Sequence, residues 1–221
     1  MMLIINILLA AIPAVYLIVR FYRNDRQKPE PKSLILKTFV FGFFSVLPAA
    51  LIEILISEFA PEQGTLIFRL FEAFIVAGCV EEGIKLLTVR LSVWNKAAFD
   101  EITDGIVYTV TASLGFAFFE NVFYSSDSPA VLLVRGITAV PLHAIASGIM
   151  GYWIGVSRVT GEKKVLKGYL TAVMIHGLYD LFLFEGGWVS FLVIPLLVLF
   201  GLKLRSLIRR SLSEDRYAGR S

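Results

Sequence analysis

The chain has 221 residues, of which 57% are hydrophobic and 18% are charged, and its mean hydropathy is +0.74. The apolar residues form long blocks rather than the short alternating runs of a soluble core, which excludes an ordinary soluble domain and predicts a multi-pass membrane protein. The net charge of +3 and the pI near 9.0 follow from basic loops on one side of a membrane, so they do not call for a nucleic-acid partner.

Seven apolar segments are each long enough to cross a hydrocarbon layer of about 30 Å, which takes roughly 20 helical residues. In chain order they cover residues 2–22, 35–57, 69–91, 105–124, 131–156, 167–185 and 188–204. The loops between them are short. The sequence therefore predicts an all-α fold, with a single membrane-embedded helix bundle over residues 1–210 and a polar C-terminal tail over residues 211–221.

The distribution of basic residues predicts how this bundle is oriented. The first segment has no positive charge before it and a basic cluster, "RFYRNDRQK", after it, which is typical of an uncleaved anchor. Of the 21 lysines and arginines, 18 fall in the first, third and fifth loops with their flanks or in the tail. The alternate loops hold only Arg69 and Arg135. The positive-inside rule therefore predicts an external N-terminus and an internal C-terminus.

The third segment contains "CVEEGIK", residues 79–85, within an otherwise apolar run. Each charged group at the middle of a bilayer costs about 2.5–3.5 kcal/mol on insertion scales. Five such groups lie within the predicted spans: Glu81, Glu82, Lys85, Glu120 and Asp180. Unpaired, they would cost on the order of 10 kcal/mol together, so we expect them to face one another or a hydrated cavity.

Depth within the spans groups these residues further. The two histidines, His143 and His176, fall at the depth of Glu81, within about one helical turn of the midplane. Lys85 lies about one turn towards the inside. Four acids lie towards the outside, namely Glu120, Asp180, Glu53 and Glu72. This distribution predicts an acidic, hydrated funnel that opens outward onto a site at the midplane.

Helical spacing indicates which of these side chains can interact. Glu81 and Lys85 are four residues apart and share a helix face, whereas Glu82 is rotated by about 100° from Glu81. The lysine can hold one carboxylate ionised while the other, less solvated, keeps its proton, which would make an acid and base pair. His176 and Asp180 are also four apart, so the carboxylate can accept the imidazole proton and fix the tautomer.

Structural explanations compete with these functional ones. The acids and the lysine could form a self-neutralised cluster, and a histidine in a helix is often a packing residue. Cys79 is the only cysteine, which excludes an intrachain disulfide and suits a small apolar filler. Ser147, Gly151 and Gly155 place a small residue at every fourth position, which predicts close helix packing and no chemistry.

Four short motifs lie on separate spans: "EEGIK", "FAFFEN", "HAIASGIMG" and "HGLYD". They resemble the EExxK, FxxxEN, HAxxxGxxxG (here with more closely placed glycines) and HGxYD motifs of the PrsW family of bacterial intramembrane proteases. That family is related to the CAAX prenyl endopeptidase and bacteriocin-processing superfamily. The resemblance begins at "IPAVYLIVRFYRND" and covers essentially the whole chain.

The resemblance implies hydrolysis of a peptide bond by a multi-pass protein of the bacterial inner membrane. The best known role of the family is the first cut in an anti-sigma factor, which implies a single-pass membrane protein as substrate. By motif, it implies catalytic roles for Glu81, Glu82, His143 and His176 and supporting roles for Lys85, Glu120, Asn121 and Asp180. The related prenyl endopeptidases have a histidine where Glu120 stands, which leaves its role open.

From these residues we expect a mechanism without a metal or other cofactor, in which Glu81 or Glu82 acts as the general base on a water molecule. His143 and His176, with Asn121 as a weaker candidate, would stabilise the oxyanion and protonate the leaving amine. The sequence does not decide between the two glutamates.

Three alternatives stay open on the sequence alone. A zinc metalloprotease could use Glu81, His143 and His176 as ligands, although there is no H-E-x-x-H pairing and Lys85 beside the acids disfavours a dication. An ion or proton transporter could use the same buried carboxylates and histidines as a relay. A non-catalytic protein of the same fold is the third.

Overall fold

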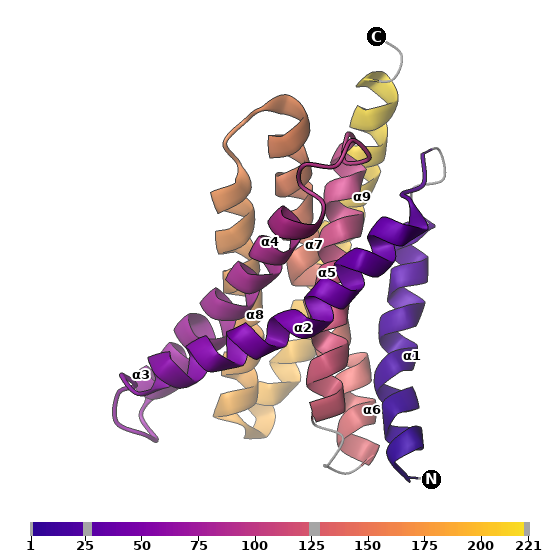
Figure 1. Cartoon of the computed structure of the whole chain (residues 1–221). Helices are drawn as coiled ribbons and strands as arrows, with labels where there is room; N and C mark the ends of the chain where they lie inside the picture. Colours follow the sequence, from indigo (N-terminus) through magenta and orange to yellow (C-terminus); the bar gives the residue numbers. More distant parts are fainter. Residues whose placement is uncertain (1, 24–27, 124–128, 219–221) are drawn as a thin grey trace.

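The computed structural model of the chain describes residues 2–23, 28–123 and 129–218, and no strand occurs within these ranges (Figure 1). The elements in chain order are α1 (Met2–Tyr22), α2 (Lys32–Ser57), α3 (Leu66–Leu70), the π-helix η1 (Phe71–Cys79), α4 (Val80–Ser92), α5 (Ile102–Phe123), α6 (Pro129–Ile137), α7 (Ala139–Thr160), α8 (Val165–Glu185), the 3₁₀-helix η3 (Gly187–Leu192) and α9 (Val193–Ala218). The predicted all-α class is confirmed.

Helices occur on each of the seven predicted segments, but only some of them qualify as spans by length and composition. Among the described residues, four helical stretches are long and apolar enough to cross a membrane: Lys32–Ser57, Ile102–Phe123, Pro129–Thr160 and Gly187–Tyr217. Ile7–Tyr22 is a shorter apolar helix. The third predicted segment is divided among α3, η1 and α4. The count of seven spans and the orientation of the termini stay predictions.

α5 lies in the middle of the bundle, and 72% of its most apolar window is buried (Figure 1). Glycines let α7 approach it closely. A Cβ atom on Gly151 would lie 2.4 Å from the carbonyl oxygen of Gly105, and one on Gly155 would lie 2.3 Å from that of Ile102. The close packing predicted from the small residues of α7 is therefore confirmed, and it brings His143 towards the centre of the molecule.

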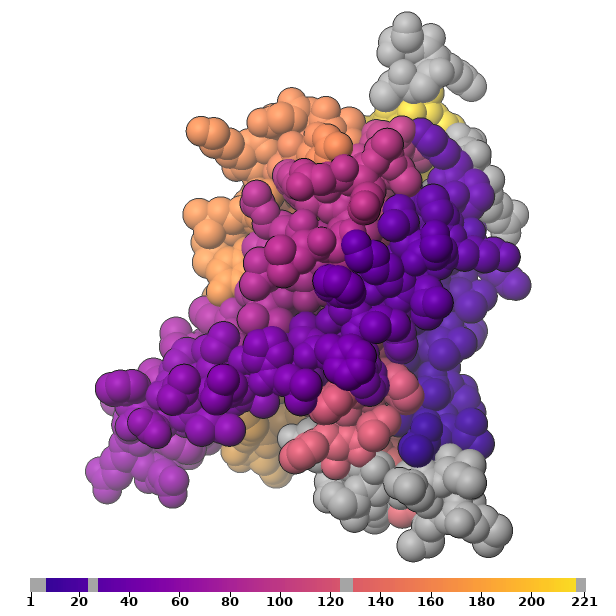
Figure 2. Space-filling view, viewed as in Figure 1, coloured from indigo at the N-terminus to yellow at the C-terminus, as the bar shows by residue number. Residues whose placement is uncertain are grey.

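α2 crosses one face of the bundle obliquely and packs on α5 and α4 (Figure 2). Its C-terminal end, with α3, projects from the side of the bundle in this view (Figure 2). Most of the outward-facing side chains of α2 are exposed and apolar, including Phe44 and Leu51. A helix with such a surface is suited to contact with lipid.

The polar stretch from residue 211, predicted as a tail, continues α9 as far as Ala218 and takes part in packing. Asp215 accepts hydrogen bonds from the backbone N–H groups of Ile102 and Thr103 at 2.8 and 3.0 Å, and from the Thr103 hydroxyl at 2.6 Å. The first N–H groups of a helix have no partner within it, so Asp215 acts as a cap for α5 supplied by another helix.

Candidate active site

A change of helix type precedes the two glutamates. The π-helix η1 ends at Cys79, and Glu81 is the second residue of α4. π-helical turns are rare and often mark functional sites, because the wider turn redirects the side chains that follow. The Tyr169 hydroxyl donates a hydrogen bond to the Cys79 carbonyl at 2.9 Å, at the junction of the two helices.

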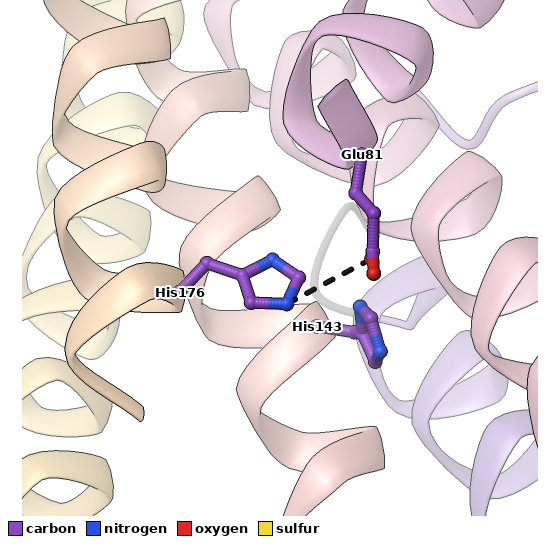
Figure 3. Close-up of side chains that lie close together, drawn as sticks. All are labelled: Glu81, His143 and His176. Atoms are coloured by element: carbon purple, nitrogen blue, oxygen red, sulfur yellow. Dashed lines mark ion pairs between the residues drawn. The ribbon is translucent and has the colours of Figure 1, made fainter. Parts of the chain in front are cut away.

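Glu81, His143 and His176 come together from three helices, α4, α7 and α8 (Figure 3). One nitrogen or oxygen atom from each side chain lies within 4.8 Å of the corresponding atoms of the other two. Nε2 of His176 is 3.7 Å from Oε2 of Glu81, and the two imidazole rings meet edge to face with their centres 5.2 Å apart. The Glu81 carboxylate points towards the space between the two rings (Figure 3).

Glu82 is fully buried and contacts neighbouring side chains instead of facing the space between the two imidazole rings. Its Oε1 atom lies 2.8 Å from Nζ of Lys85 and 2.9 Å from Nδ1 of His176. Its Oε2 atom accepts a hydrogen bond from the Ser147 hydroxyl at 2.8 Å. Glu82 thus makes all of these contacts with other protein side chains. The two adjacent glutamates therefore have different surroundings, which suit them to different roles.

Lys85 is also fully buried and contacts three members of the site. Its Nζ atom lies 3.0 Å from Glu81, 2.8 Å from Glu82 and 2.9 Å from Nδ1 of His143. The ring of Phe116 lies 4.5 Å from Nζ. An ammonium group has three donors, and the two carboxylates and the imidazole together can use all of them.

The FxxxEN residues form a second polar group that reaches His143 from the other side. Glu120 lies 3.0 Å from Nε2 of His143 and accepts a hydrogen bond from Arg135 at 2.6 Å. Arg135 also donates from Nε to the Asn121 side-chain oxygen at 2.8 Å. Arg135, from α6, therefore ties together the two polar residues of the motif.

A pocket of about 320 Å³ opens over these residues. Among the described residues, its acidic lining residues are Glu53, Glu72, Glu81, Glu120 and Asp180, and its one arginine or lysine is Arg135. His143 and His176 also line it, whereas Glu82 and Lys85 do not. The arrangement has the acidic character expected of the funnel, with Glu81 as the glutamate of the pair that faces it.

Asp180 lies where the spacing predicted, with Oδ2 3.3 Å from Nε2 of His176. The other ring nitrogen, Nδ1, lies 2.9 Å from Oε1 of Glu82, which can accept a hydrogen bond from it. Glu82 is therefore the group that fixes the orientation of the His176 ring, while Asp180 lies on the pocket side.

Three residues of the site were not singled out from the sequence for chemistry. The available signal for Arg135 was that it is one of only two basic residues in the loops that otherwise lack positive charge. Ser147 was assigned to packing, yet its hydroxyl contacts both Glu82 and the Ser113 hydroxyl, the latter at 2.9 Å. Ser113 also lies 3.0 Å from the backbone oxygen of His143, and nothing in its sequence context indicated this.

The three converging side chains are of types that could hold a divalent metal ion such as Zn²⁺. Two imidazoles and one carboxylate form a ligand set used by catalytic zinc sites, which keep further positions for water and substrate. The contact of Glu82 with Nδ1 of His176 resembles the outer carboxylate that orients a metal-bound histidine. The donor chemistry of Glu81, His143 and His176 is therefore suitable for a metal.

The fold is a bundle of apolar helices, as in a membrane-embedded protein. The bundle holds a buried carboxylate–histidine site and an acidic pocket, and these provide the side chains that hydrolysis requires. Residues 30–202 match the model of a family described as "PrsW family intramembrane metalloprotease". The chain belongs to this PrsW protease family, as the motifs of the sequence suggested.

Individual relatives agree with this assignment. The chain is 32% identical over 198 residues to the Protease PrsW of Geobacillus kaustophilus, a match that covers 87% of this chain and 86% of the relative. It is 31% identical over 200 residues to that of Bacillus subtilis, covering 86% and 89%. For Oceanobacillus iheyensis the identity is 34% over 203 residues, covering 88% and 91%. No solved structure matches the chain significantly. The chain is thus a membrane protease.

Proposed function

We propose that the chain cleaves a membrane-anchored protein at this site, with Glu81, His143 and His176 as the reacting side chains. The observation that supports this is their convergence, from three helices, on the wall of one acidic pocket. As substrate we propose a single-pass membrane protein such as an anti-sigma factor. Because the relatives are bacterial proteins, the proposed location is the bacterial inner membrane, crossed several times.

We further propose that Glu81, His143 and His176 hold a zinc-type ion. The donor set, the surplus of acids around the pocket and the description of the family as metalloproteases support this version. When bound, such an ion would polarise the scissile carbonyl and make a water molecule a stronger nucleophile.

The chain itself supplies the groups that move protons. Glu120 and Asp180 both line the pocket next to a histidine, so either carboxylate can take a proton from the attacking water and return it to the leaving amine. Arg135 holds Glu120 in position from the other side at 2.6 Å. Glu82 and Lys85 orient the histidines and Glu81 from behind the pocket.

One observation favours the metal-free mechanism expected from the sequence. Nδ1 of His143 faces Nζ of Lys85 at 2.9 Å, while Nε2 faces Glu120 at 3.0 Å. An ammonium group that donates to Nδ1 leaves the ring proton on Nε2, so His143 would act as a hydrogen-bond donor and not as a ligand. Glu81 would then be the general base on water.

The test is proteolysis of a panel of single-pass anti-sigma-type proteins by the purified chain in liposomes, together with its metal content. A metal-dependent enzyme should carry about one zinc per chain, lose activity on chelation and regain it with Zn²⁺. Glu81→Gln and His176→Ala should then lose both metal and activity, while Glu62→Gln, an exposed control outside the pocket, should keep both.

The other outcomes are equally distinct. Activity that resists chelation in a protein without bound metal, yet is lost in Glu81→Gln, would establish the metal-free mechanism. Cleavage at the wild-type rate in both Glu81→Gln and His176→Ala would show that this pocket is not the active site.

A further inference from the structure

A second groove lies between α1, α7 and α9, away from the candidate active site. It encloses about 260 Å³, and its floor is formed by Pro141, Ala144 and Ile145 of α7. Its walls come from α1 and α9 and are mostly apolar. None of its lining residues belongs to the pocket described above.

Two arginines lie at this groove, one on each wall. Arg20 belongs to the last turn of α1, and Arg205 belongs to α9; both are exposed. Within the part of the chain that the structure describes, no acidic residue lines the groove. Among the described residues Arg205 forms no ion pair. An apolar groove with an arginine on each of two walls is complementary to an anionic amphiphile.

The position of the groove suits a lipid. α1 and α9 run in the same direction (Figure 1). Arg20 lies in the last turn of α1, and Arg205 lies at the middle of α9. The end of the bundle towards which α1 and α9 run carries most of the basic residues. Basic pockets between membrane helices bind anionic headgroups, and guanidinium groups match phosphate oxygens well.

We propose that this groove binds an anionic phospholipid, with its phosphate between Arg20 and Arg205 and an acyl chain along α7. The floor segment brackets His143, whose ring faces the opposite side of α7, on the candidate active site. A bound lipid would therefore pack against the helix that carries His143 from the side away from the pocket.

Gly201 offers a variant that closes the groove and leaves both arginines in place. A Cβ atom at Gly201 would lie 3.6 Å from Cδ1 of Ile145, which is an ordinary contact. Gly201→Leu should therefore fit on α9 while its side chain fills the space of the acyl chain.

The experiment is a titration of the delipidated, detergent-solubilised full chain with dioleoyl phosphatidylglycerol or dioleoyl phosphatidylcholine, read by native mass spectrometry. The wild type should bind phosphatidylglycerol about tenfold more tightly than phosphatidylcholine or better. Arg20→Gln/Arg205→Gln should weaken phosphatidylglycerol binding roughly 30-fold, at about fivefold for each arginine near the headgroup. Gly201→Leu should weaken it about tenfold through loss of the buried chain.

The matched control is Lys203→Gln/Arg209→Gln, which removes the same charge from exposed positions of α9 outside the groove. Its phosphatidylglycerol binding should stay within about twofold of the wild type, since it leaves the groove intact. An equal loss in both double variants would reduce the effect to general surface charge and overturn the proposal. If Gly201→Leu bound phosphatidylglycerol as tightly as the wild type, the headgroup would bind without an acyl chain in the groove. That result would also overturn the proposal.

Discussion

At the scale of single residues, the two neighbouring glutamates of "CVEEGIK" have different surroundings and hence different roles. Glu82 is enclosed by Lys85, His176 and Ser147, and every one of these contacts is 2.9 Å or shorter. The Glu81 side chain keeps 12% of its surface exposed and faces the pocket. Glu81 is therefore the one of these two carboxylates that faces the pocket, and the proposed role of Glu82 is that of a positioning residue.

Glu82→Gln should accordingly affect stability and activity together. The amide keeps the shape of the side chain but removes a charge that is buried against Lys85, and breaking such a pair costs about 3 kcal/mol. Loss of the contact to His176 should lower activity about 10- to 100-fold, as for other groups that orient a reacting histidine. Unfolding in detergent and proteolysis in liposomes would measure the two effects.

Glu81→Gln provides the comparison. Lys85 keeps Glu82 as a partner in this variant, so the unfolding free energy should change by less than in Glu82→Gln, while activity should fall about 100-fold or more. Equal destabilisation by the two substitutions would contradict the division of roles between the glutamates.

Substitution of Arg135 should lower activity, as substitution of a motif residue should. It uses two different nitrogens for Glu120 and Asn121, and a lysine cannot reproduce that geometry. Arg135→Lys should therefore lower kcat/KM about tenfold with little change in stability. The control is Arg69→Lys, since Arg69 pairs with Glu185 at 2.7 Å outside the pocket. A wild-type kcat/KM for Arg135→Lys would show that Arg135 contributes only its positive charge.

At the scale of elements, the placement of the site depends on how closely α7 approaches α5 and on the π-helix before α4. The first feature could be predicted, because small residues at every fourth position have one common use in membrane helices. The second could not. The stretch "FEAFIVAGC" is apolar on nearly all sides, so its pattern carries no period that would separate a π-helix from an α-helix.

Gly151→Ala should disturb the site through the first of these features. Its Cβ atom would meet the backbone oxygen of Gly105 at 2.4 Å, and a backbone atom cannot move aside as a side chain can. We expect α7 to shift, with a loss of about 1–3 kcal/mol in unfolding free energy and reduced proteolysis.

Gly83→Ala is the matched control, although it lies between the catalytic motif residues. Its Cβ atom would meet only the Tyr169 side chain, at 3.7 Å or more, and alanine favours a helix by about 0.5–1 kcal/mol over glycine. This variant should be as stable as the wild type or more so. Comparable losses in the two variants would mean that helix separation is not the cause.

At the scale of the whole molecule, the sequence predicted the helical class, and the resemblance of its motifs predicted the protease family. Of the expected site residues, Glu81, Glu120, His143, His176 and Asp180 line one pocket, whereas Glu82 does not. Their convergence could be predicted because charges in apolar helices must find partners, and depth along a helix can be counted from the sequence. Depth does not define rotation about the helix axis, so which glutamate faces the pocket, and what Ser147 contacts, required the structure. The cap that Asp215 places on α5 joins distant parts of the chain, which no local pattern indicates.

The orientation of the bundle is the remaining prediction at this scale, and it decides from which side a substrate reaches the site. Glu53 and Glu72 line the pocket and flank the loop that contains Gln63, so the pocket lies towards that side of the bundle. With the N-terminus outside, as the basic loops predict, Gln63 is external and the loop containing Glu162 is internal. Both residues are exposed.

Single cysteines at these two positions test the orientation, because Cys79 is the only native cysteine and can be removed as Cys79→Ser. In intact cells a membrane-impermeant maleimide should label Gln63→Cys and should reach Glu162→Cys only after the membrane is opened. The expected pattern would place the scissile bond in the outer half of the membrane. The reverse pattern would invert the bundle and bring the acidic pocket to the cytoplasmic side, so that substrates would have to be cut there.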